Sequence, residues 1–303
     1  MTPSVRFGAH SVEFSSLDKV LFPESGFTKG DLVDHYRIVA PCMLPHVRRR
    51  PLTLQRFPEG IGQAGFYQKE APNFFPAWIA RARVTLEDGS QQDQVTADNL
   101  ATLAFLGQQA AVTLHVWTSR APAWTHPDRI VFDLDPGEPT TFATTRATAH
   151  SLRDRLRAVG LTAFAMITGS RGIHVWVPIR RGPDFDEVRS FARSVASSIV
   201  ADRPADLTDE IRKDKRAGRL FIDIGRNGKG QTCVAPYSLR ALPAAPVATP
   251  VTWSELSDLD GAGAYTLESL PRRLARRDDP WKGMGRHAAD FARARRLWER
   301  SEG

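Results

Sequence analysis

The alternation of hydrophobic and polar positions is most regular in the middle of the chain. Short apolar runs bounded by glycine, proline or charged residues predict strands there, and two stretches with apolar residues every three or four positions predict helices. The predicted strands span 129–135, 161–167, 173–179 and 219–224, and the predicted helices span 144–159 and 185–200. Their order, β-α-β-β-α-β, is that of the ferredoxin-like (RRM-like) fold.

Glycine and proline mark where these elements end. Pro136 and Gly137 end the first strand, because proline has no N–H to continue the ladder. Gly160 is the expected C-cap of the first helix, and residues 168–172 form a tight turn between the second and third strands. The first helix is expected to turn one face inward, with Ala147, Leu152, Leu156 and Val159.

Composition changes divide the chain into three parts. A run rich in proline and alanine over 241–250 predicts an extended connector on the surface, and a softer break lies at 119–127. We therefore expect an N-terminal α/β lobe (1–120), a central catalytic lobe (121–240), and a connector with a helical tail (241–303). The expected fold class is α+β, with the ferredoxin-like lobe packed on the N-terminal lobe.

Composition and charge narrow the function classes. The 303 residues are 42% hydrophobic and 25% charged, which is typical of a globular protein. Lysine and arginine (41) exceed aspartate and glutamate (34), and the resulting charge of +7 favours a polyanionic partner. Cys42 and Cys233 are too far apart for a CxxC metal motif. Because we find no apolar leader and no apolar run of membrane length, the expected location is the cytoplasm, at the nucleoid, with no membrane partner.

Three aspartates in two predicted strands are the candidate catalytic and metal-binding residues. Period-two alternation places Asp133 and Asp135 on one face of their strand, and Asp223 alternates with the apolar residues of another strand. Like charges this close are unfavourable unless a cation lies between them. Oxygen ligands suit Mg²⁺ or Mn²⁺, and two such ions can activate a 3′-hydroxyl and neutralise a triphosphate. A DxD pair also occurs as a turn cap at strand ends.

Basic and polar residues surround these acids in the sequence. His174 alternates with apolar neighbours and follows the turn that contains Ser170 and Arg171, whose backbone N–H groups are candidates for binding phosphate oxygens. A basic run over 212–219 precedes the strand of Asp223. This distribution indicates an enzyme that handles a triphosphate and nucleic acid, although a solvated charged surface gives a similar pattern.

The order of these motifs resembles the archaeo-eukaryotic primase superfamily, and most closely the polymerase domain of bacterial ligase D and its stand-alone relatives. The motifs are Asp18–Pro23, Thr28–Tyr36, Gly65–Lys69, Leu114–Val116, Asp133–Asp135, Thr168–His174, Phe221–Asp223 and Ala235–Arg240. The resemblance implies a primase-polymerase fold. It also implies a template-directed DNA or RNA nucleotidyltransferase that fills gaps or extends ends in DNA repair, such as non-homologous end joining.

The resemblance further implies roles for individual residues. Asp133, Asp135 and Asp223 would bind two metal ions, with manganese commonly favoured. The nucleotide-binding residues would be Thr168, Ser170, Arg171, His174, Arg216, Arg226 and Arg240. The DNA-binding residues would be Lys19 and Lys29, which grip a 5′-phosphate, Ser16 and His115 nearby, and Phe66 and Tyr67, which stack on template bases.

The sequence departs from the family pattern at several of these positions. Thr168 and Arg171 stand where we expect serine and lysine, Ser16 stands for asparagine, and Tyr67 stands for phenylalanine. The implied substrates are DNA with gaps or breaks that carry a 5′-phosphate, and NTPs or dNTPs. Family members often prefer ribonucleotides. They work with the Ku end-binding protein and an ATP-dependent DNA ligase, which we expect to be a separate protein.

Other interpretations fit part of the pattern. The run 131–135 resembles the nucleophile strand of haloacid dehalogenase-type phosphatases, but Pro136 and Gly137 follow it where that family has a threonine-bearing turn. A DNA-end-binding module without catalysis would need the basic residues but not the three acids. Phe66 and Tyr67 are equally compatible with a place in the core, because large aromatic side chains are usually buried.

Overall fold

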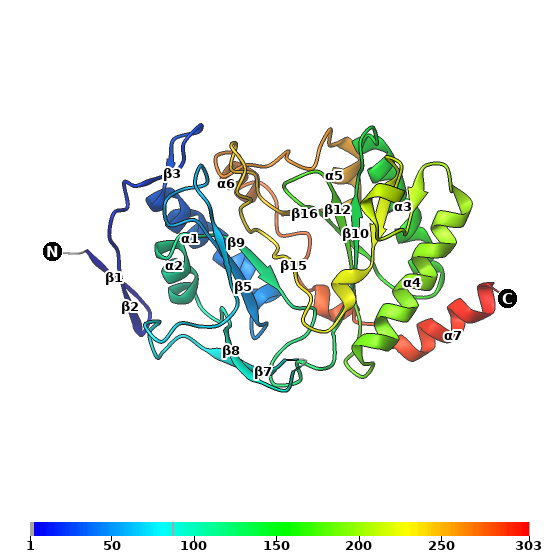
Figure 1. Ribbon diagram of the computed structural model, residues 1–303, viewed down its shortest axis with the longest axis horizontal. Helices are drawn as coiled ribbons and strands as arrows, with labels where there is room; N and C mark the ends of the chain where they lie inside the picture. Colours follow the sequence, from blue (N-terminus) through cyan, green and yellow to red (C-terminus); the bar gives the residue numbers. More distant parts are fainter. Residues whose placement is uncertain (1–2, 87, 303) are drawn as a thin grey trace. The chain divides into compact units, whose positions relative to one another are not determined.

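The computed structural model describes residues 3–86 and 88–302, which form two compact units. The N-terminal unit contains the described residues up to 122, together with 232–248 and 265–277. The central unit contains 123–231, 249–264 and the residues from 278 onward. The segment after residue 240, expected as a connector and tail, therefore contributes to both units. Figure 1 shows the elements of each.

The central unit is built on one six-stranded sheet. Its strands, in spatial order, are β13 (Leu207–Thr208), β14 (Leu220–Asp223), β10 (Arg129–Asp135), β12 (Ile173–Pro178), β11 (Phe164–Ile167) and β16 (Thr249–Val251). Helices α3 (Phe142–Ala158) and α4 (Phe185–Asp202) lie on one side of it (Figure 1). The elements β10, α3, β11, β12, α4 and β14 occur in this order along the chain, with the two-residue β13 and a 3₁₀ turn before β14, which confirms the predicted β-α-β-β-α-β order.

Helix α3 and its C-cap bury three of the four residues predicted to face inward, Leu152, Leu156 and Val159, but not the fourth. Ala147 is exposed, and the buried positions are Thr145, Thr148, Ala149, Leu152 and Leu156. Two of these are threonines, which an apolar pattern leaves out. Their hydroxyls donate to carbonyl oxygens four residues earlier in the chain, at 3.2 and 2.9 Å, so they are buried without an unsatisfied donor. The C-cap of this helix is Val159, and Gly160, predicted as the cap, follows it with φ +79°, the left-handed conformation that glycine favours just after a cap.

The proline- and alanine-rich run over 241–250 is not an extended connector on the surface. Its second half, 245–250, is buried, and β16 pairs with β11 at the edge of the central sheet. Pro250 lies within β16, a position that proline tolerates because an edge strand needs donors on one side only. The proline content predicted a loop, but residues 249–251 form a strand because they pair with β11, which is distant in sequence.

The N-terminal unit combines two helices of nine residues or more with a four-stranded sheet and three hairpins. The helices are α1 (Lys29–Val47) and α2 (Leu100–Gln108), and the sheet order is β15 (Cys233–Val234), β9 (Ala111–Val116), β5 (Leu52–Arg56) and β6 (Phe66–Gln68). The hairpins are β1 (Ser4–Phe7) with β2 (His10–Glu13), β3 (Val20–Phe22) with β4 (Phe27–Thr28), and β7 (Arg81–Thr85) with β8 (Gln91–Val95).

Local sequence explains how α1 begins. Thr28 and Asp31 form a capping box, in which each side chain accepts from the other's backbone N–H at 3.2 and 2.7 Å. The cap fixes the first turn of the helix, where Lys29 is located.

The remaining helices are short or lie near the C-terminus. They are α5 (Trp253–Asp258), α6 (Leu270–Leu274), α7 (Phe291–Glu302) and the 3₁₀ turns η1 (Lys213–Lys215), η2 (Gly225–Asn227) and η3 (Met284–His287). Among the residues that the structure describes, no helix has the length and apolar character needed to cross a membrane.

Candidate active site

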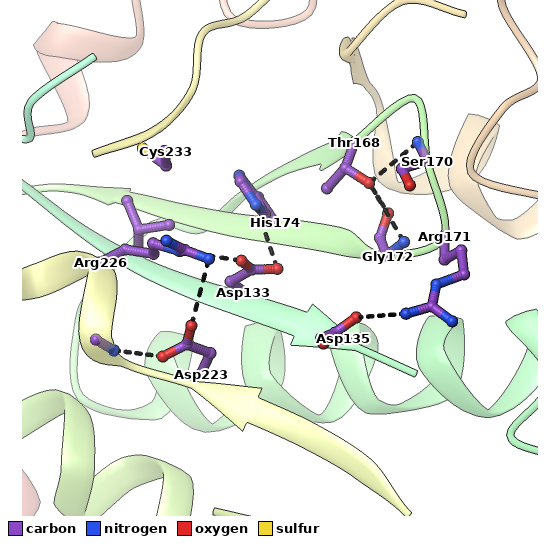
Figure 2. Close-up of polar contacts among 12 residues, drawn as sticks. Asp133, Asp135, Thr168, Ser170, Arg171, Gly172, His174, Asp223, Arg226 and Cys233 are labelled. Carbon is purple, nitrogen blue, oxygen red and sulfur yellow. Dashed lines mark hydrogen bonds and ion pairs between the residues drawn. The ribbon is translucent and has the colours of Figure 1, made fainter. Parts of the chain in front are cut away.

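Three side chains form one row across the central sheet. β14 and β12 flank β10, so Asp133 lies directly opposite Asp223 on one side and His174 on the other. Residues paired in this way point to the same face of a sheet, and Figure 2 shows the three side chains together. Leu134, which points to the opposite face, is fully buried. Strand pairing therefore brings together two acids and a histidine that are distant in sequence.

Asp133, at the centre of the row, is a carboxylate stabilised in its charged form by two neighbours. Asp133 Oδ1 lies 3.3 Å from His174 Nε2, and its Oδ2 lies 3.2 Å from Arg226 Nε. Burial alone would raise the pKa of Asp133, but the attraction and hydrogen bonds of His174 and Arg226 outweigh burial and lower the pKa to about 2. Burial raises the pKa of Asp223, although the Gly225 N–H donates to its Oδ1 at 2.7 Å.

The acidic residues fit divalent metal ions by their chemistry. A positive group already lies between two of them, because the guanidinium of Arg226 contacts Asp133 and also lies 3.6 Å from Asp223. Asp135 is paired with Arg171 at 3.6 Å and with Arg216 at 3.5 Å. Each acid thus has a cationic partner. Over the described ranges, no three Asp, Glu, His or Cys side chains converge closely enough to hold one ion with the side chains as they lie.

The turn between β11 and β12 is closed by a threonine hydroxyl. Thr168 Oγ1 donates to Gly172 O at 3.0 Å and accepts from the N–H groups of Ser170 and Gly172 at 3.4 and 3.3 Å. This differs from the expectation that the Ser170 N–H is available for phosphate, because that N–H is directed to a side chain of its own turn. Arg171 is 63% exposed and points to Asp135 (Figure 2).

Arg216 is fixed before any ligand binds. Its guanidinium lies over the ring of Phe221 at 3.6 Å and donates to the carbonyl oxygens of Glu210 and Ile211 at 3.0 and 2.9 Å. Because only 14% of its side chain is exposed, it is a more rigid cation than Arg171.

Sequence reasoning missed one buried residue of this site, Asn227. Its Oδ1 accepts from Val131 N at 2.8 Å, and its Nδ2 donates to Val131 O at 2.7 Å and to Ile224 O at 3.0 Å. At Val131, where β10 has no backbone partner from β14, the Asn227 side chain supplies the two hydrogen bonds instead. It thereby fixes η2, the turn that carries Arg226. A lone asparagine after a strand gives no signal of this role in the sequence.

Replacing Asn227 with alanine is expected to lower the free energy of unfolding by about 2–4 kcal/mol, because it removes three buried hydrogen bonds. Urea denaturation measures the change. Asn73→Ala, at an exposed position, is the matched control and should change stability by less than about 0.5 kcal/mol. Equal stability of the two variants would contradict this role.

The predicted DNA-binding residues all belong to the N-terminal unit, and so does Arg240. Phe66 is 46% exposed and Tyr67 is 61% exposed, so the alternative that both are core residues is wrong. The Tyr67 ring contacts His115 edge-on, with centroids 5.9 Å apart. Ser16 has φ +50°, a conformation that asparagine adopts more readily than serine, which gives a physical reason for asparagine in the family pattern.

Comparison with known proteins places the chain in a family. Residues 28–281 match the family model described as "LigD, primase-polymerase domain". The chain is 36% identical over 281 residues to the "Multifunctional non-homologous end joining DNA repair protein LigD" of Mycobacterium tuberculosis, an alignment that covers 88% of this chain and 36% of that protein. It is 28% identical to the "Bifunctional non-homologous end joining protein LigD" of Bacillus subtilis, over 92% of this chain and 45% of that protein.

A solved structure is also similar. The "Polymerase Domain from Mycobacterium tuberculosis Ligase D in complex with DNA" superposes with a TM-score of 0.86 at 34% identity, and the match covers 91% of this chain and 99% of that one. The chain spans little more than a third of the length of the M. tuberculosis protein, so it corresponds to one part of that longer protein.

The fold and the family match together define a nucleotidyltransferase of the primase-polymerase type. The chain belongs to the family of LigD primase-polymerase domains. The predicted family, fold and enzyme class are confirmed, and family membership favours the polymerase over the phosphatase interpretation.

Proposed function

We propose that the chain adds nucleotides, under the direction of a template, to DNA ends or gaps during repair such as non-homologous end joining. The observation that supports this most directly is the cross-strand row of Asp223, Asp133 and His174, with Asp135 further along the same strand. A phosphatase nucleophile needs one aspartate at a strand end, whereas two-ion nucleotidyl transfer needs acids from more than one strand.

In this proposal, Asp133, Asp135 and Asp223 hold two divalent ions, with Mn²⁺ preferred to Mg²⁺. When bound, such ions lower the pKa of the primer 3′-hydroxyl and neutralise charge on the triphosphate. His174 holds Asp133 in place through the contact at Nε2. Once the acids are neutralised, the cationic side chains that pair with them become available to the triphosphate: Arg171, Arg216 and Arg226. Thr168 shapes the turn beside them, and Ser170 and Arg240 complete the proposed nucleotide contacts.

The N-terminal unit supplies the proposed DNA contacts. Lys19 and Lys29 would bind the 5′-phosphate on the far side of a gap, with Ser16 and His115 beside them. The exposed rings of Phe66 and Tyr67 would stack on template bases, which aromatic side chains do with any base. Ku and a separate ATP-dependent ligase are the proposed protein partners, and the nucleoid is the proposed location.

Primer extension on gapped DNA tests this function. We expect extension that requires a divalent cation, is faster with Mn²⁺ than with Mg²⁺, and increases when the downstream strand carries a 5′-phosphate. Parallel reactions with rNTPs and dNTPs measure the sugar preference. Phosphate release from a simple phosphomonoester without extension would instead support the phosphatase, and DNA binding without incorporation would support the non-catalytic module.

A further inference from the structure

Two lysines and one glutamate form a compact charged group in the N-terminal unit. Lys19 Nζ lies 2.7 Å from Glu59 Oε2. Lys29 is mostly buried, and its Nζ donates to Ser15 O at 2.7 Å. The two lysines are linked through the backbone, because Lys29 N donates to Lys19 O at 2.8 Å. Two lysines on paired backbone segments thus share one small region, with a carboxylate on the ammonium of Lys19.

The charges of both Lys19 and Glu59 act on Lys29. Burial lowers the pKa of Lys29, and the charge of Lys19 lowers it further, whereas Asp18 and Glu59 oppose this shift. Two positive charges that act on each other attract an anion. In this structure the anion that meets Lys19 is a side chain of the protein itself.

The position of Glu59 is set by the backbone. Gly60 has φ +85°, and a Cβ there would lie 3.1 Å from the carbonyl oxygens of Val20 and Leu21, so the turn packs directly on β3. Ile61 N donates to Leu21 O at 2.8 Å, which fixes the turn on the strand next to Lys19. The Glu59 side chain itself is 71% exposed, so it can change rotamer and leave Lys19. The fixed backbone keeps it close enough to form the ion pair again.

We propose that Glu59 is a displaceable counter-ion that takes the place of the DNA 5′-phosphate on Lys19 and thereby limits how strongly the protein prefers phosphorylated ends. The inference rests on the proposed function, in which Lys19 and Lys29 bind that phosphate. A phosphate monoester carries more negative charge and more acceptor oxygens than a carboxylate, so it can displace Glu59. DNA ending in a hydroxyl offers no such group and leaves the pair intact.

Solvent exposure of the Lys19–Glu59 ion pair determines how strongly Glu59 competes with the 5′-phosphate. Glu59 and Lys19 are both partly solvated, and exposed ion pairs contribute little, so the competition is modest. Removing the charge of Glu59 is expected to increase the preference for a 5′-phosphate about threefold. The gain should shrink at high salt, because screening weakens both the ion pair and the phosphate contact.

Binding of gapped duplex DNA, measured by fluorescence anisotropy with and without a downstream 5′-phosphate, tests this. The readout is the ratio of the two affinities for Glu59→Gln, Lys19→Ala and the double variant. Glu24→Gln, an exposed glutamate in the β3–β4 turn, removes the same formal charge and is the matched control. We expect Glu59→Gln alone to raise the ratio, Glu24→Gln to leave it unchanged, and the effect of Glu59→Gln to vanish in the Lys19→Ala background.

The outcomes separate the inference from its premise. If Lys19→Ala lowers the ratio but Glu59→Gln leaves it unchanged, the counter-ion role is wrong and the 5′-phosphate site stands. A ratio unaffected by Lys19→Ala overturns both. An equal increase for Glu59→Gln and Glu24→Gln shows an effect of net charge and also overturns the inference.

Discussion

Replacing Asp133 with alanine is expected to reduce primer extension by about a thousandfold or more, while DNA binding stays at least as tight. Asp133 is the central residue of the row, since it pairs with Asp223 and His174 across the strands and contacts Arg226. Its removal takes away a proposed metal ligand and one of the two carboxylates that Arg226 contacts, while Asp223 still lies 3.6 Å from that guanidinium. Steady-state extension kinetics and anisotropy titrations measure the two effects separately.

Asp278→Ala is the control for this experiment. The Asp278 side chain is 87% exposed and its ion pair is with an exposed lysine four residues later, so extension should be unchanged. An Asp133→Ala protein that extends primers at the rate of the unmodified protein would show that the row is not the catalytic centre. Loss of DNA binding in parallel with extension would point to a folding defect, which circular dichroism detects.

Replacing Gly172 with alanine is expected to destabilise the central unit by about 3 kcal/mol and to abolish extension. A Cβ at this position would lie 2.2 Å from the carbonyl oxygen of Leu134, which is backbone and cannot move independently. Leu134 lies between Asp133 and Asp135, so any shift that relieves the clash displaces both acids. Thermal and urea denaturation report the loss of stability, and gapped-DNA extension reports the loss of activity.

Gly182→Ala is the matched control in the same unit, because a Cβ there has no neighbour within 4 Å. It should leave stability and extension close to those of the unmodified protein. If Gly172→Ala is as stable and active as Gly182→Ala, the close approach of the turn to β10 is not a constraint on the site.

The central sheet and its acids could be predicted from the sequence because their signals are local. Period-two alternation around Asp133 and Asp135 shows both the strand and the shared face, and the apolar neighbours of Asp223 show the second strand. Antiparallel pairing in the ferredoxin-like order then determines that the acids of different strands meet. Alternation was sufficient to assign the faces of β10, because one face packs on the core and the other carries the charged residues of the site.

Other features depend on contacts between distant residues and left no local pattern. Asn227 acts through two backbone groups of Val131, and Glu59 through Lys19, which is 40 positions away. Pairing with β11 turned a proline-rich run into the edge strand β16. Ala147 was assigned to the buried face because apolar residues alone were counted, whereas threonines with satisfied hydroxyls occupy part of that face.

The path of the chain limits how the protein can be divided. The backbone passes from one compact unit to the other at residues 122, 231, 248, 264 and 277, so neither unit is a continuous stretch of sequence. A fragment that ends at residue 240 would keep the three aspartates but lose an edge strand and Trp281, whose fully buried ring packs on Trp176. Two cuts therefore cannot excise the unit that contains the three aspartates, because its described residues come from three separate segments of the chain.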